Sequence, residues 1–323
     1  MKEQENRYGL VDLHLHLDGS LSVKTVRELA GMQGITVEDR DADLLRRLQV
    51  GPDCKDLNEY LEKFDFPCSL LQTKEAIALA VSNLLEELRA QGLIYAEIRF
   101  APQLHVHRGL SQTEVVAAAV EGLSRSSLRA NLILCCMRGG DNRTANLETV
   151  DVAAQYLNRG VCAVDLAGAE ALFPTFGFED VFDHAKALGV PCTIHAGEAD
   201  GPVSVRTALD FGAARIGHGV RSVEDPELMA YLAKQGIALE LCPTSNLNTN
   251  IFESIRQYPL PELLNAGVHV TINTDNITVS GVTLQSEWEK IIGTFSLSQD
   301  QILQILQNAV DASFAAPDDK KWM

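Results

Sequence analysis

The sequence predicts an α/β fold in which eight parallel strands, each followed by a helix, close into a (β/α)8 barrel. Short apolar or β-branched runs alternate with longer amphipathic stretches along the chain, the pattern of βα units on a parallel sheet. Eight such runs are present, which favours a closed barrel over an open sheet. At 323 residues, with no internal repeat, low-complexity tract or linker, the chain is expected to form one domain over residues 1–323.

Strands and helices are expected in alternation. The strands are predicted at residues 9–14, 94–100, 131–137, 161–166, 191–195, 215–218, 237–241 and 268–274. The helices are predicted at residues 74–91, 112–127, 146–158, 178–188, 203–211, 225–235 and 261–265, with 284–292 and 299–314 after the last strand. Several of these helices end at a glycine just past the last apolar position, the usual C-terminal signal.

One segment breaks this alternation. Residues 22–73, between the first and second strands, are far too long for a single crossover, and long insertions at the mouth of a barrel are commonly lids. A helix is predicted over residues 56–64, and its apolar positions share one face: Leu57, Tyr60, Leu61 and Phe64. We expect this helix to be a lid over the mouth; a helix that only packs on the barrel wall is the alternative.

The composition describes an ordinary globular protein that is strongly acidic. Hydrophobic residues make up 46% and charged residues 22%, and the net charge of −17 argues against a nucleic-acid partner. No stretch approaches the roughly 20 apolar residues that cross a membrane, and residues 1–7 lack the apolar region of a signal peptide. Seven cysteines, none in a CxxC pair, are interpreted as buried thiols in a reducing cytoplasm. The sequence does not indicate an oligomeric state.

Two histidines end the first strand. Side chains alternate between the two faces of a strand, so His14 and His16 point the same way, with Cα atoms roughly 6.6 Å apart. Two adjacent imidazoles can hold one divalent ion, and zinc suits nitrogen ligands. Two polar residues on a solvated strand face would give the same pattern, so the metal interpretation depends on further ligands elsewhere.

Those further candidates follow other strands. The carboxyl ends of barrel strands meet at one mouth, where catalytic groups gather. The ionisable residues at these ends are His195 and Glu198 after the fifth strand, His218 after the sixth and Asp275 after the eighth. A lone histidine at any one of these positions is more often structural, but several converging on one mouth favour a metal site.

The ordered motifs resemble those of the adenosine deaminase family of metal-dependent hydrolases. They are HLHLDGS at 14–20, EIRFAPQLH at 97–105, DLAGAE at 165–170, HAGEADGP at 195–202, RIGHG at 215–219 and NTD at 273–275. The resemblance covers about residues 10–313. It implies a TIM barrel with one zinc ion that deaminates adenosine, and 2′-deoxyadenosine, to inosine and ammonia in purine salvage.

The same resemblance implies a role for each site residue. The metal ligands would be His14, His16, His195 and Asp275, with Glu198 as proton donor to purine N1 and His218 as the base beside the attacking water. His16 would also border the substrate, and Asp18 would contact the ribose hydroxyls. The Gly168 backbone N–H would contact purine N3, and the apolar lid would cover the purine. These roles suit the residue types, because zinc lowers the pKa of its water to about 7 and a shielded glutamate keeps its proton. For Asp18 the alternative is a helix N-cap.

Several other functions were weighed. Deamination of free adenine or of a modified aminopurine nucleoside is the nearest alternative, although relatives acting on the free base tend to resemble HLHIEG rather than HLHLDG. A two-metal barrel usually needs a bridging lysine, and none lies between Lys74 and Lys186. Cytidine-type deaminases carry a PCxxC signature that is absent here. A barrel kept only as a binding scaffold would be expected to lack a ligand or the acid.

One residue departs from the family pattern. Many members carry a second aspartate after the metal-binding one, and here that position is Asn276. Purine N7 only accepts hydrogen bonds, and an amide donates at any pH, so Asn276 is expected to contact N7 without needing a proton. A different substrate, or a simple turn cap, would also explain the asparagine.

Overall fold

A computed structural model describes residues 9–321 and 323 of the chain. The expectation about residues 1–7 therefore lies outside the described residues. None of the described helices is long and apolar enough to cross a membrane. All seven cysteines are free thiols; six are buried, and Cys68 is partly exposed.

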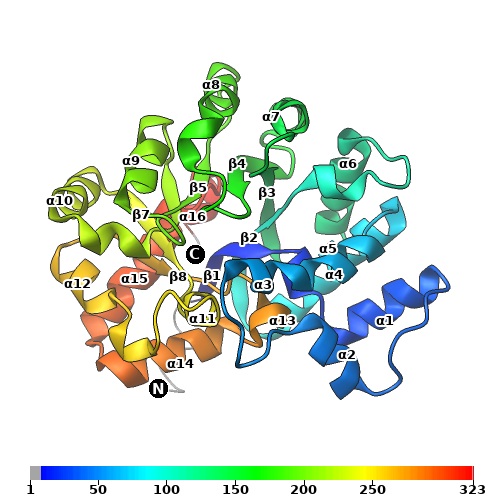
Figure 1. Ribbon diagram of the computed structural model, residues 1–323, viewed down its shortest axis with the longest axis horizontal. Helices are drawn as coiled ribbons and strands as arrows, with labels where there is room; N and C mark the ends of the chain where they lie inside the picture. Colours follow the sequence, from blue (N-terminus) through cyan, green and yellow to red (C-terminus); the bar gives the residue numbers. More distant parts are fainter. Residues whose placement is uncertain (1–8, 322) are drawn as a thin grey trace.

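The structure contains the eight predicted strands, and they run parallel in sequence order (Figure 1). Their bounds are β1 Leu10–His16, β2 Leu93–Phe100, β3 Arg129–Met137, β4 Val161–Ala167, β5 Thr193–Ala196, β6 Arg215–His218, β7 Ala238–Leu241 and β8 Val270–Ile272. Strand β6 matches its predicted bounds, while β8 is shorter at both ends than residues 268–274.

The strands form two four-stranded groups, β1 to β4 and β5 to β8, which join at both edges. Val164 pairs with Cys192 between β4 and β5, and Leu15 pairs with Asp275 between β1 and the end of β8. At this second join His16 N donates to Asp275 O over 2.7 Å, and Asp275 N donates to His14 O over 2.8 Å. The ring of strands is therefore closed, and it closes at the residues predicted to bind metal.

Helices follow each other around the outside of the strands (Figure 1). The main ones are α5 Lys74–Ala90, α6 Gln112–Ser124, α7 Arg143–Tyr156, α8 Glu179–Ala187, α9 Pro202–Asp210, α10 Pro226–Gln235, α12 Leu260–Asn265, α14 Leu284–Phe295 and α15 Gln299–Ala312. Each overlaps a predicted helix. Shorter elements on the loops are η2 Asp18–Ser20, η4 Pro102–His105, η5 Thr175–Phe178, η6 Val220–Glu224, α11 Pro243–Asn248, η7 Ile255–Gln257, α13 Ile277–Ser280 and α16 Pro317–Lys320. The apolar core lies between this outer ring of helices and the strands.

The insertion after β1 is helical, as predicted, but the helix expected over residues 56–64 is interrupted. The segment forms α1 Val23–Met32, α2 Asp41–Leu48, α3 Leu57–Leu61, η3 Glu62–Phe64 and α4 Asp65–Leu70. Pro67 explains the break: a proline lacks the backbone N–H needed inside a helix and is tolerated only in the first turn. A new helix therefore begins at Asp65, two residues before it.

Candidate active site

A cavity of about 720 Å³ opens at the carboxyl ends of the strands. Nearly all the predicted site residues line it: His16, Asp18, Leu57, Tyr60, Leu61, Phe64, Gly168, His195, Glu198, His218, Asp275 and Asn276. His14 is the exception among them; it is fully buried. The structure thus brings together side chains that are up to 262 residues apart in the sequence, counting from His14 to Asn276.

Four histidines and one aspartate converge at the floor of this cavity. Potential ligand atoms of His14, His195, His218 and Asp275 all lie within 4.8 Å of one another. His16 joins them: its Nε2 lies 3.3 Å from His195 Nε2 and 3.5 Å from Asp275 Oδ1. Asp275 Oδ1 is also 3.5 Å from His14 Nε2. All the predicted metal ligands are in this cluster, and His218 lies at its edge.

The chemistry of these donors fits a metal ion. His14 Nε2 is buried without a hydrogen-bond partner among the described residues. Nitrogens held about 2.0–2.1 Å from one tetrahedral ion would be roughly 3.3 Å apart, and His16 Nε2 and His195 Nε2 have this separation. Their approach without an ion would require one ring to donate to the other. The described residues therefore fit a single ion bound through imidazole nitrogens and one carboxylate.

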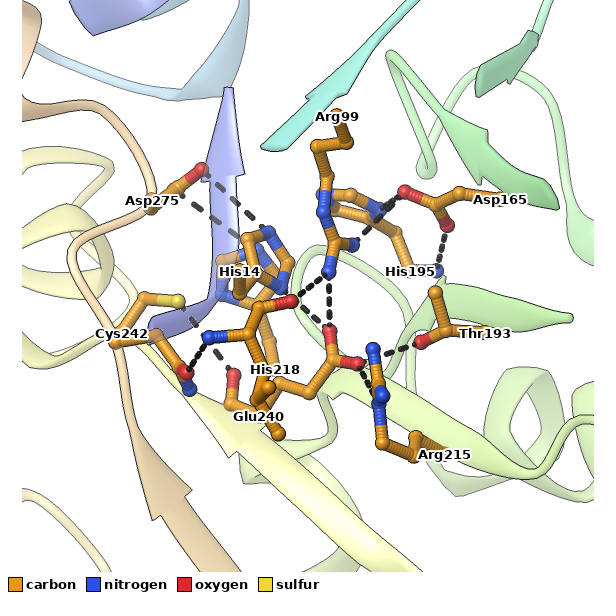
Figure 2. Close-up of polar contacts among 12 residues, drawn as sticks. His14, Arg99, Asp165, Thr193, His195, Arg215, His218, Glu240, Cys242 and Asp275 are labelled. Carbon is orange, nitrogen blue, oxygen red and sulfur yellow. Dashed lines mark hydrogen bonds and ion pairs between the residues drawn. The ribbon is translucent and has the colours of Figure 1, made fainter. Parts of the chain in front are cut away.

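Carboxylates on the far side orient two of these rings (Figure 2). His14 Nδ1 lies 2.8 Å from Glu240 Oε2, and His195 Nδ1 lies 2.8 Å from Asp165 Oδ2. Glu240 accepts a hydrogen bond from His14 Nδ1–H, which leaves the His14 Nε2 lone pair facing the cluster, the arrangement common around zinc-binding histidines. The contact of Asp165 with His195 Nδ1 is an ion pair.

Two buried arginines hold these carboxylates ionised. Arg99 pairs with Asp165 at 2.9 Å and with Glu240 at 2.8 Å, and Arg215 pairs with Glu240 at 2.6 Å. Burial would raise the pKa of Glu240, but the two guanidinium groups outweigh burial and keep that pKa well below its usual range. A buried charge is stable only when paired in this way. The inside of the barrel therefore holds a network of paired charges that contacts His14 and His195 (Figure 2).

Two cluster residues have an unusual backbone conformation. His218 has φ 57° and Asp275 has φ 61°, in the left-handed region that non-glycine residues rarely adopt. Each costs about 1–2 kcal/mol relative to an ordinary conformation. The strain turns both side chains out of the strand ends into the cluster, and for Asp275 the closing hydrogen bonds to β1 hold it in place.

Glu198 is buried beside the cluster, with Oε2 3.7 Å from His218 Nε2. Burial, and then the charges of Asp275 and Glu170, raise its pKa well above the usual value. The loop that carries it is held by Glu170, whose carboxylate accepts hydrogen bonds from four backbone N–H groups and one hydroxyl: those of Gly197, Glu198, Ala199 and Asp200, and Ser204 Oγ.

The family model for adenosine deaminase matches residues 10–323. The chain belongs to the adenosine deaminase family.

Full-length relatives agree with this assignment. The adenosine deaminase of Haemophilus ducreyi is 51% identical over 324 residues, which covers 98% of this chain and 94% of the relative. The adenosine deaminase of Enterococcus faecalis is 40% identical over 318 residues, with 97% and 94% covered.

Solved structures show the same fold. The crystal structure of adenine deaminase from Arthrobacter aurescens superposes with a TM-score of 0.87 at 27% identity, covering 98% of this chain and 96% of that one. The apo structure of the N6-methyl-AMP deaminase from Arabidopsis thaliana gives a TM-score of 0.85 at 25% identity, covering 100% and 96%.

The cavity wall of this adenosine deaminase family member carries the polar residues expected to contact substrate. Asp18 caps no helix, since helix α1 is capped by Ser22 and the N-cap of η2 is Leu17. Its Oδ1 is buried without a partner among the described residues, and burial raises its pKa to about 6. Gly168 has φ 107°, which only glycine adopts readily.

Asn276 lies beside Asp275 and is packed against Gly19. A Cβ at position 19 would come 1.8 Å from Asn276 Oδ1, so the glycine of the HLHLDGS motif makes room for this amide. Asn276 Oδ1 has no hydrogen-bond partner among the described residues.

The apolar lid candidates border the cavity, but they do not share one environment. Leu57, Leu61 and Phe64 are partly buried, and the Phe64 ring lies 6.5 Å from the His16 ring. Tyr60 is 1% exposed, and its hydroxyl lies 2.7 Å from Ser280 Oγ. Tyr60 therefore also anchors the segment to helix α13.

Sequence reasoning missed several residues of the site. His107 and Arg108 line the cavity, and neither belongs to one of the motifs. Glu240 contacts the metal-ligand candidate His14, and Asn246 contacts the catalytic candidate His218. Both lie on or just after the seventh strand, which carries none of the recognised motifs. Glu170 could have been found, because it ends the DLAGAE motif.

Proposed function

We propose that this chain hydrolyses adenosine, and 2′-deoxyadenosine, to inosine and ammonia, with one zinc ion per chain, as a single domain over residues 1–323 in the cytoplasm. The observation that carries the proposal is the cluster of imidazoles and Asp275 beside a buried Glu198 in one cavity. Family membership and a relative 51% identical support the same reaction.

His14, His16, His195 and Asp275 would hold the ion. When bound, zinc would supply a polarised water whose pKa falls to about 7. Hydroxide from this water, whose proton has gone to solvent, would add to C6 of the purine while Glu198 gives a proton to N1. The C6–N bond would then break as the amino group takes the proton of the new hydroxyl and leaves as ammonia, and Glu198 would regain its proton from solvent. His218 lies on the side of the cluster next to Glu198, where it would hydrogen-bond the attacking oxygen. The surrounding cavity keeps other water away from this step.

The remaining cavity residues would place the nucleoside. Asp18 would accept from the ribose hydroxyls through its unpartnered Oδ1, and the Gly168 N–H would donate to N3. The unpartnered carboxylate oxygen favours a nucleoside over free adenine, because a free base would leave that oxygen buried without a partner. A deaminase of adenine or of a modified aminopurine nucleoside is the second candidate, and a solved relative is an adenine deaminase.

Ammonia release tests the proposal directly. Purified protein is assayed with adenosine, 2′-deoxyadenosine, adenine and N6-methyladenosine, and metal per chain is measured on protein grown without added zinc. We expect the highest kcat/KM with adenosine or its deoxy form and a stoichiometry near one. Preference for adenine would support the second candidate, and two ions per chain would refute the mononuclear site.

Apolar contact from the lid segment is expected to act on substrate binding. Replacing Leu57 or Phe64 with alanine should raise KM roughly tenfold and leave metal content unchanged, because each side chain covers the cavity without touching the ligands. Phe66→Ala is the matched control, since Phe66 lies in the next helix, stacks under Arg47 and does not line the cavity. If all three variants lose stability equally and keep the same KM, the segment is only structural.

The Asn276 contact can be tested with 7-deazaadenosine, in which CH replaces N7. The analogue would leave the amide without an acceptor. We expect kcat/KM to fall about 5- to 150-fold, which corresponds to a loss of about 1–3 kcal/mol of transition-state stabilisation. In Asn276→Ala the two substrates should react at similar rates, since the contact is already gone. Equal rates in the unsubstituted protein would show that Asn276 does not contact N7.

A further inference from the structure

Asn246 lies between the two catalytic candidates. It is in helix α11, just after strand β7, and is fully buried. Its Nδ2 is 3.1 Å from His218 Nδ1 and 3.4 Å from Glu198 Oε1. Among the described residues, only Asn246 hydrogen-bonds to both of these side chains.

The other end of the same amide is also occupied. The Tyr258 hydroxyl donates to Asn246 Oδ1 over 3.2 Å, and Tyr258 is itself buried. A primary amide has two N–H donors and one carbonyl acceptor. With the carbonyl facing Tyr258, both N–H groups are available to His218 and Glu198, the contact to Glu198 being the longer and weaker one.

This arrangement constrains where His218 carries its hydrogen. A ring nitrogen that accepts a hydrogen bond has no hydrogen of its own, so a neutral His218 must carry its hydrogen on Nε2. Nε2 faces the site, 3.7 Å from Glu198 Oε2 and 4.0 Å from Asp275 Oδ2. In a doubly protonated ring, the Nδ1–H of His218 and the Nδ2–H of Asn246 would both be donors and would face each other without an acceptor.

We propose that Asn246 is a positioning residue that fixes the Nε2–H tautomer of His218 and turns the free oxygen of Glu198 toward the substrate. The catalytic consequence rests on the proposed function, whereas the tautomer does not. A ring with hydrogen on Nε2 presents a donor to the attacking water. It can hold the oxygen of an attacking hydroxide at C6. The water has by then given its proton to solvent, so His218 acts as a hydrogen-bond donor and not as the base that the resemblance implied.

The tautomer can be measured without any turnover. Zinc-loaded protein labelled with ¹⁵N at histidine gives distinct Nδ1 and Nε2 signals, and His218→Gln identifies the signals of His218. We expect protonated Nε2 and unprotonated Nδ1 for His218, and the reverse in Asn246→Asp, whose carboxylate accepts where the amide donates. Protonated Nδ1 in the unsubstituted protein would overturn the proposal, because the amide would then face the other way.

Kinetics provide the second readout. Asn246→Asp should lower kcat by about 100-fold with KM and zinc content unchanged, in the range of lost proton-transfer or oxyanion groups. Asn248→Asp makes the same exchange in the same helix, at a residue that does not line the cavity, and should stay near the original rate. Tyr258→Phe keeps the fold of the amide pocket while removing its anchor, and should lower kcat roughly three- to tenfold.

The two measurements distinguish a failure of the tautomer proposal from a failure of the proposed deaminase function. If the unsubstituted protein releases no ammonia from any aminopurine, the proposed function fails, yet the ¹⁵N signals still decide the tautomer. If Asn246→Asp keeps its kcat, or keeps Nε2 protonated, Asn246 does not set the state of His218 and the proposal is refuted.

Discussion

Replacing Glu198 with glutamine is expected to lower kcat by about 10²–10⁴-fold while zinc content and KM stay unchanged. Glutamine has nearly the same shape, and its amide can still hydrogen-bond N1, but it cannot give up a proton there. Burial and neighbouring charges raise the pKa of Glu198 well above its usual value, which favours the protonated form that a proton donor needs. In the unsubstituted enzyme the rate should fall as the pH rises through that raised pKa.

Steady-state kinetics of ammonia release from adenosine, with metal analysis of the same samples, measure this effect. Glu179→Gln makes the same exchange at an exposed position outside the cavity and should leave the rate unchanged. A Glu198→Gln enzyme of near-normal kcat would show that N1 receives its proton from another group.

Replacing His195 with alanine is expected to remove metal and activity together. The substitution deletes a nitrogen that lies 3.3 Å from His16 Nε2 in the cluster, and three remaining donors hold an ion less tightly than four. Metal per chain should fall from near one toward zero, with a rate loss of at least about 10³-fold, the scale of several kcal/mol of transition-state stabilisation.

A chelator experiment separates this effect from simple damage to the fold. Excess zinc should restore chelated unsubstituted protein but not His195→Ala. His105→Ala serves as the control, since His105 is also a fully buried histidine but contacts Phe100 rather than the cluster. Full metal content in His195→Ala would remove His195 from the ligand set.

Sequence patterns alone could place most of the histidines of the site at the ends of strands. His14 and His16 follow a two-residue period, and His195 and His218 end apolar runs. Parallel strands in a barrel share one mouth, so local patterns were enough to bring these residues together. The β6 bounds and the free cysteines were also predicted, because burial and apolar runs are local features of the sequence.

The segment that was predicted to be a lid marks where local patterns failed. The spacing of Leu57, Tyr60, Leu61 and Phe64 predicted one continuous helix, yet the chain breaks into α3, η3 and α4. The period was right about which side chains face the cavity. The spacing of apolar residues takes no account of Pro67, at which a new helix has to begin. It also gives no sign of the contact between the Tyr60 hydroxyl and Ser280, which is more than two hundred residues away.

By itself, the sequence determined the eight strands, their order and the histidines at their ends, because each depends on neighbours within a few residues. Only the tertiary structure decided how the strands meet. Asp275 takes its strained conformation because the barrel closes there onto His14 and His16. Glu240 orients His14, and Asn246 contacts His218 and Glu198, because neighbouring strand ends and loops converge at this mouth. Such contacts depend on strand register across the whole ring, which no local pattern encodes.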